Sequence, residues 1–174
     1  MDSIRIDLVA GLIRENDDGT YPGGVAGFAQ NMGSYYLVAL EGFLFDESTI
    51  YHEISHVIDK RLAWDALLRE GALYSEDAWM SLHPEGFQYA MSYTDYPKEL
   101  DQYLEARYFV SGYSMTFPTE DRATLMESAM DGSFWIFEPG SPCREKLQYY
   151  AACIRDCFDT TGWPAVTLWE KVLN

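Results

Sequence analysis

The first third of the chain shows the alternation of apolar and polar residues that indicates β-strands. Residues 4 to 13 combine partial alternation with β-branched side chains, and residues 35 to 40 are the best strand candidate. A turn is predicted at residues 16 to 19, and the Gly-rich stretch from 21 to 33 predicts loop mixed with short strand. We therefore expect a small twisted N-terminal sheet, with residues 35 to 40 as a strand beside the functional cleft.

Helical periodicity replaces this alternation after the polar residues 46 to 48, whose side chains can cap a helix. A long helix is predicted from about residue 48 to about residue 68. Its core-facing stripe follows the i, i+4, i+7, i+8 rule and consists of Ile50, Ile54, Val57 and Ile58. At about 100° per residue, His52, His56 and Asp59 lie roughly opposite this stripe. The helix is thus apolar on one side and carries reactive groups on the other.

Further helices are predicted in the last third of the chain. Pro118, which a first helical turn tolerates, opens a second long helix at about 118 to 131. Its apolar stripe consists of Leu125, Met126, Ala129 and Met130. A third helix is expected at 142 to 158, and a short one at 164 to 173.

The middle of the chain has no clear period. Glycines and prolines among many aromatic residues predict short elements and ordered loop at 70 to 97, and residues 108 to 110 are read as strand or loop. The aromatic residues expected to pack rather than to line a substrate pocket are Trp79, Phe87 and Tyr89. Strands followed by helices favour an α+β fold, and 174 residues fit one domain spanning residues 1 to 174.

Charge narrows the possible functions. The chain carries 28 Asp and Glu against 12 Lys and Arg, a formal net charge of -16. Such a surface repels nucleic-acid phosphates and anionic membranes, whereas it attracts positively charged peptides. No stretch approaches the roughly 20 apolar residues that span a bilayer, and the charged start lacks the apolar run of a signal peptide. We therefore expect no nucleic-acid or membrane role.

The three cysteines, Cys143, Cys153 and Cys157, lie away from the histidines. Cys153 and Cys157 are one helical turn apart, and the odd count leaves at least one thiol unpaired within a monomer. No second Cys-x-x-Cys pair exists, so a cysteine zinc site is disfavoured. We instead interpret the three cysteines as small buried apolar residues near the C-terminus.

The sequence from His52 to His56 reads HExxH and falls on the predicted first long helix. Residues at i and i+4 share a helix face, so the two imidazoles can reach one metal ion. Glu53 is then directed at a water whose pKa zinc lowers from about 15.7 to about 7, and it can act as general base. Two of the three histidines of the chain lie in this motif, which strengthens the prediction of zinc.

Zinc requires a third protein ligand and an open fourth position. No histidine follows in the metzincin pattern, because Leu62 and Asp65 stand there instead. His83 is a possible ligand, but it precedes Pro84 in a loop-like stretch. Glu120, in the first turn of the second long helix, is the better candidate.

Residues 113 to 123 resemble the second half of the active site in anthrax-lethal-factor-like metallopeptidases, a family that includes secreted Pro-Pro endopeptidases. Its members carry HExxH, then a tyrosine and, seven residues later, a glutamate that opens a helix. Tyr113 and Glu120 have this separation. The resemblance implies a zincin-like fold of the gluzincin type, Glu120 as the third zinc ligand, and Tyr113 as a hydrogen-bond donor to the oxyanion. It also implies a secreted or cell-surface bacterial enzyme.

The resemblance covers about two dozen positions and has departures. The gap between His56 and Glu120 is longer than in the relatives, and the extra segment includes residues 79 to 93. Thr124 stands where the lethal factor has a second glutamate, although Glu127 shares a face with Glu120 and can substitute. Asp59 matches an aspartate of the family; it is either a partner of a ligating histidine or a solvated carboxylate.

The sequence therefore predicts a monomeric zinc endopeptidase with a peptide or protein substrate. The alternative is a catalytically silent zincin-fold module that binds peptides without cutting them. A zinc hydrolase acting on a non-peptide amide, and a structural domain with a chance motif, are the other readings.

Overall fold

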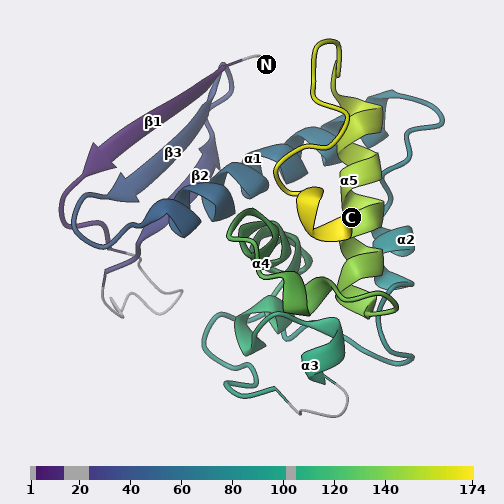
Figure 1. Cartoon of the computed structure of the whole chain (residues 1–174). Helices are drawn as coiled ribbons and strands as arrows, with labels where there is room; N and C mark the ends of the chain where they lie inside the picture. Colours follow the sequence, from purple (N-terminus) through teal and green to yellow (C-terminus); the bar gives the residue numbers. More distant parts are fainter. Residues whose placement is uncertain (1–2, 14–23, 101–104) are drawn as a thin grey trace.

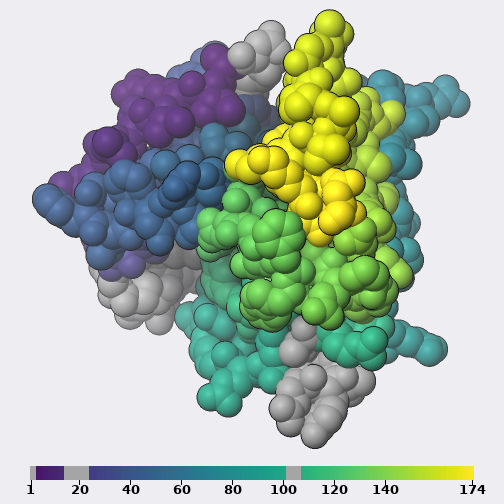
Figure 2. All heavy atoms as spheres, in the orientation of Figure 1, coloured from purple at the N-terminus to yellow at the C-terminus, as the bar shows by residue number. Residues whose placement is uncertain are grey.

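The computed structural model describes residues 3–13, 24–100 and 105–174, and within these ranges the fold is α+β (Figure 1). The strands are β1 (Ile4–Val9), β2 (Gly27–Asn31) and β3 (Tyr36–Glu41), which form one small sheet in the order β1-β3-β2. Strand β1 is parallel to β3, and β2 is antiparallel to it. Figure 2 shows this sheet, in purple and blue, on one side of a larger helical body.

Helix α1 (Glu47–Leu68) packs against the sheet. Asp46 caps it by accepting a hydrogen bond from the Thr49 amide at 3.0 Å. The apolar face of β3 and the predicted stripe of α1 form one cluster, which contains Tyr36, Val38, Leu40, Ile50, Ile54 and Val57. Alternate residues of a strand point to the same face, so β3 supplies every second side chain to this cluster. Three residues of the predicted α1 stripe therefore pack against the sheet as expected, whereas the fourth, Ile58, packs against the core of the helical body.

The helical body consists of α1, α4 (Pro118–Met130) and α5 (Pro142–Cys157), with the short helices α2 (Glu76–Met80) and α3 (Glu105–Tyr108). Three 3₁₀ turns complete it: η1 (Gly112–Met115), η2 (Phe134–Phe137) and η3 (Lys171–Leu173). The core lies between the long helices and includes Leu62, Trp79, Leu125, Met126, Leu147, Tyr150 and Ile154. The predicted bounds of α1, α4 and α5 are confirmed to within one residue.

The strand beside the cleft was predicted wrongly. Residues 36 to 41 form the central strand β3, and β2 is the sheet edge that faces the functional cleft. Strand β3 is central because it pairs with β1 on one side and with β2 on the other. At Gly27 of β2, a Cβ would lie 2.9 Å from Glu53 Cγ. A glycine therefore lets the backbone of β2 approach the face of α1 that carries the reactive groups.

Two other element predictions need correction. The first strand ends at Val9 rather than at residue 13, since Gly11 turns the chain with φ of 76°. Within residues 164 to 173 only Lys171–Leu173 is helical, as the 3₁₀ turn η3, and the Thr167 amide and hydroxyl donate to Glu170 Oε2 in the single turn before it. The turn predicted at residues 16 to 19 lies outside the described residues.

The cysteines and the aromatic residues of the middle segment behave as predicted. Cys143 and Cys153 are buried, Cys157 is half-buried, and all three are free thiols. Trp79 and Tyr89 are buried, and Phe87 packs on Phe109. In the described part of the chain, no helix has the length and apolarity needed to cross a membrane.

Candidate metal centre

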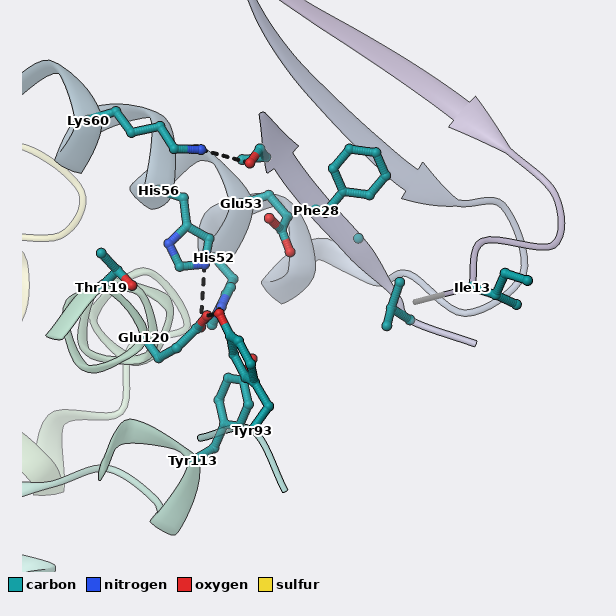
Figure 3. A pocket seen from close by; sticks show the side chains of 13 residues that line it. Ile13, Phe28, His52, Glu53, His56, Lys60, Tyr93, Tyr113, Thr119 and Glu120 are labelled. Carbon is teal, nitrogen blue, oxygen red and sulfur yellow. Dashed lines mark hydrogen bonds and ion pairs between the residues drawn. The ribbon is translucent and has the colours of Figure 1, made fainter. Parts of the chain in front are cut away.

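Three predicted metal ligands converge where α1 packs against α4. His52 and His56 lie one turn apart on α1, and Glu120 lies in the first turn of α4 (Figure 3). Glu120 Oε2 lies 3.0 Å from His52 Nε2 and 3.3 Å from His56 Nε2. All three ligand atoms lie within 4.8 Å of one another, so one ion could contact them together.

The donor set and its spacing fit zinc. Zinc in hydrolases is held by histidine nitrogens and one carboxylate, and ligand atoms on a tetrahedral ion lie about 3.3 Å apart. The two distances from Glu120 Oε2 already have about this value. Thus His52, His56 and Glu120 could hold one zinc ion with only a small adjustment of the side chains.

Glu127 orients the first histidine. Its Oε2 lies 3.0 Å from His52 Nδ1, on the opposite side of the ring from Glu120. Burial lowers the pKa of His52, but the hydrogen bonds to Glu120 and Glu127 outweigh it and raise this pKa to about 9. A carboxylate on the distal nitrogen fixes the tautomer and ring orientation of a ligating histidine. Glu127 can therefore take the place of the second glutamate of the lethal factor, since this chain has Thr124 at that position.

Glu53 lies beside the ligands and is only 6% exposed. Within the described residues, its buried Oε2 has no hydrogen-bond partner. Burial raises the pKa of Glu53 above its ordinary value, although the two histidines oppose this. A buried carboxylate oxygen without a partner is costly in a folded protein, so its presence at this position suggests a functional use.

The site opens into a cleft along β2. A cavity of about 420 Å³ is lined by β2, α1, the start of α4 and the tyrosines Tyr93 and Tyr113. A second hollow of about 450 Å³ adjoins it at His52 and Glu53 and is lined by Ser48, Thr49, Ser111, Thr124 and Glu127, among others. Gly27, His52, Glu53 and Tyr113 line both hollows, so the cleft extends to both sides of the reactive groups.

Two tyrosines face the ligands. The ring of Tyr113, on η1, lies 6.2 Å from the ring of His52. Tyr93 donates its hydroxyl to Glu120 Oε1 at 2.9 Å (Figure 3). No sequence pattern distinguishes Tyr93, because it is one of 13 tyrosines and lies in the segment interpreted as an insertion. Its position depends on the chain folding back at Gly112, where a Cβ would meet the Pro97 carbonyl oxygen at 1.9 Å.

Asp59 is not a solvated carboxylate. It is buried, and Arg122 Nη2 donates to its Oδ2 at 3.0 Å. Arg122 lies two residues after Glu120 on α4, so this ion pair joins the two helices that carry the metal ligands. The described hydrogen bonds of Asp59 are to Arg122 and Tyr74, and neither is a histidine of the candidate metal site.

His83 lies apart from the convergent ligands, in a second buried polar cluster. Its Nε2 lies 2.9 Å from Asp121 Oδ2, which also accepts from Tyr89 at 2.7 Å and from Lys146 at 2.7 Å. Burial raises the pKa of Asp121, but Lys146 and His83 outweigh it and lower this pKa. The cluster ties α4 to α5 and to the loop that contains Tyr89. His83 is therefore structural rather than a third metal ligand.

Replacing Tyr93 by phenylalanine is expected to lower zinc affinity about tenfold, since loss of an outer hydrogen bond to a metal ligand costs 10- to 100-fold. The hydroxyl of Tyr93 holds Glu120 Oε1 and leaves Oε2 directed at the histidines. Competition with a chromophoric chelator measures the change. Tyr96→Phe is the matched control, because Tyr96 contacts Tyr113 through its ring. Equal affinities for both variants would contradict this role of Tyr93.

Gly27→Ala should destabilise the fold by about 1–3 kcal/mol, the usual cost of overpacking. The new Cβ would lie 2.9 Å from Glu53 Cγ and 3.1 Å from the Ala39 carbonyl oxygen. At Gly42 the nearest atom to a new Cβ is 3.5 Å away, so Gly42→Ala is the control. Urea unfolding measures both, and a similar loss in the two variants would show that Gly27 is not under special constraint.

No protein-family model, curated protein or solved structure matches this chain. What the site can do must therefore be inferred from its own residues.

Proposed function

We propose that this chain is a zinc-dependent endopeptidase with a zincin-like fold. The observation that carries the proposal is the convergence of His52, His56 and Glu120 beside the buried, partly unpartnered carboxylate of Glu53. Two histidines and a carboxylate leave one position of a tetrahedral zinc ion open, as in catalytic rather than structural zinc sites.

The residues around the ligands supply the remaining chemistry. When bound there, zinc would lower the pKa of a water ligand and polarise a carbonyl. Glu53 takes the proton from the attacking water and passes it to the leaving amine, a role that its raised pKa favours. Tyr113, which lines both hollows of the cleft, would donate a hydrogen bond to the developing oxyanion.

The cleft supports an extended peptide as the substrate. Strand β2 is a sheet edge, and a peptide can add to such an edge through main-chain hydrogen bonds. Hollows on both sides of Glu53 leave room for residues before and after the cleaved bond, which favours cutting within a chain. The net charge of -16 would draw positively charged proteins toward the cleft.

The test is metal-dependent proteolysis of an unfolded protein such as reduced casein. Cleavage should stop after treatment with a chelator and return when one equivalent of zinc is added. His56→Ala should bind zinc far more weakly and should not recover at the same zinc concentration. Cleavage that persists in the fully demetallated protein would rule out the proposal.

A further inference from the structure

Lys60 continues the reactive face of α1 into the cleft. It lies one helical turn beyond His56, at the i+4 position, so His52, His56 and Lys60 follow one another along the same face. Of the 13 residues that line the cavity of about 420 Å³, it is the only lysine or arginine. Its Nζ donates to the Ala29 carbonyl oxygen of β2 at 2.7 Å (Figure 3).

In the described part of the chain, the ammonium of Lys60 forms no ion pair with a carboxylate, although the carboxylates of Glu53 and Asp59 act on it from a longer distance. An ammonium has three N–H donors, and the described hydrogen bond to Ala29 uses one. By contrast, the buried Lys146 is paired with Asp121 at 2.7 Å. In a chain with 28 acidic and 12 basic residues, a half-buried lysine that faces a cavity without such a pair is suited to an anionic ligand.

The contacts between β2 and α1 show which end of a peptide would lie near Lys60. Gly27 adjoins Glu53, and two residues later Ala29 contacts Lys60, so β2 and α1 run in the same direction along the cleft. A peptide added antiparallel to β2, the slightly more stable pairing, runs the opposite way. Its N-terminal residues would pass Lys60, and its C-terminal residues would pass Thr49 and Glu127 in the other hollow.

Helix geometry gives the position along the peptide. Lys60 lies six residues beyond the midpoint of the HExxH motif, or about 9 Å along the helix axis. An extended peptide advances about 3.3 Å per residue, so Lys60 would meet a side chain about two or three residues before the cleaved bond. After the bond, an acidic side chain would instead approach the carboxylate of Glu127.

We propose that Lys60 selects substrates with an aspartate or glutamate two or three residues before the cleaved bond. This rests on the proposed peptidase function, because it takes the bond as lying at Glu53 and the metal ligands. Lys60 is a specificity-determining residue of the cleft, and its carbonyl contact to β2 holds the ammonium in place.

The experiment uses zinc-loaded Glu53→Gln protein, which retains the cleft, to select peptides from a randomised pool. Peptides that differ only in Asp, Asn or Lys at each position then give dissociation constants by fluorescence anisotropy. We expect Asp to bind about tenfold more tightly than Asn at one position before the bond, as for a partly buried charge-assisted hydrogen bond. Introducing Lys60→Met into the Glu53→Gln protein should remove this preference for Asp. Introducing Lys60→Glu instead should make the peptide with Lys bind most tightly.

Lys171→Met is the matched control, since it makes the same charge change on the exposed C-terminal turn η3 and should keep the tenfold preference. The same preference in the Lys60→Met variant would overturn the proposal, as would an acidic preference confined to positions after the bond. Binding selectivity is read without cleavage. The wild-type protein could therefore show an acidic preference that depends on Lys60 and yet cut no peptide. That result would refute the peptidase function and would support Lys60 as a binding site for acidic side chains.

Discussion

Glu53→Gln protein is expected to bind zinc as tightly as the wild type and to cleave peptides at least about a hundredfold more slowly. Glutamine has nearly the same shape, so the ligands His52, His56 and Glu120 keep their positions. It cannot accept a proton, and general base catalysis contributes about 10² to 10⁴ in rate. We expect the buried Oε2 of Glu53 to be the atom that accepts the proton.

This prediction requires two measurements on the same preparation. Zinc affinity is obtained by chelator competition, and kcat/KM from a fluorogenic peptide identified as a substrate. Glu70→Gln is the control, because Glu70 is exposed just after α1 and should leave both quantities unchanged. Wild-type rates in the Glu53→Gln protein would exclude Glu53 as the base, and loss of zinc would assign it a role in metal binding instead.

Arg122→Met is expected to destabilise the metal-free protein by about 3–5 kcal/mol, which is the cost of removing one partner of a buried ion pair. Arg122 is 1% exposed and donates to Asp59 and to Glu76. Its removal leaves the carboxylate of Asp59 buried without its cation. Because this pair joins α1 to α4, the folded fraction should also bind zinc more weakly.

Urea unfolding and chelator competition test the two parts of this prediction. The double variant Asp59→Leu with Arg122→Met should recover much of the lost stability, since replacing both partners by apolar residues is often nearly neutral. Arg155→Met is the control, because Arg155 forms a half-buried pair with Glu170 that is more exposed than the pair of Arg122 with Asp59, and its loss should cost less. Equal losses for Arg122→Met and Arg155→Met would show that the buried pair does not hold the helices together.

The long helices and the two histidines of the candidate metal site were predictable because each depends on local spacing. The HExxH motif and the apolar stripe of α1 both follow the helical period, so one pattern placed His52 and His56 opposite the core. Glu120 was selected from its place in a first helical turn together with a family resemblance. Packing of α1 on α4 then brings it to within 3.0 Å of His52.

The remaining features depend on tertiary packing, which periodicity does not encode. Nothing in the alternation of β3 distinguishes a central strand from an edge, whereas the approach of β2 depends on the contact of Gly27 with Glu53. Tyr93 reaches Glu120 from a segment that bonds the main chain at Met115 and Thr116 and that approaches Gly112 closely. The buried cluster of Asp121, His83 and Lys146 joins residues up to 63 positions apart, beyond the reach of local patterns.

The most direct test of the central claim is to expose a diverse peptide library to the zinc-loaded wild-type protein and to locate the cut sites by mass spectrometry. We predict cuts at internal peptide bonds that are absent with Glu53→Gln protein at equal zinc occupancy. Cuts made equally by both proteins, or no cuts by a wild-type protein shown to hold one zinc ion, would contradict this claim.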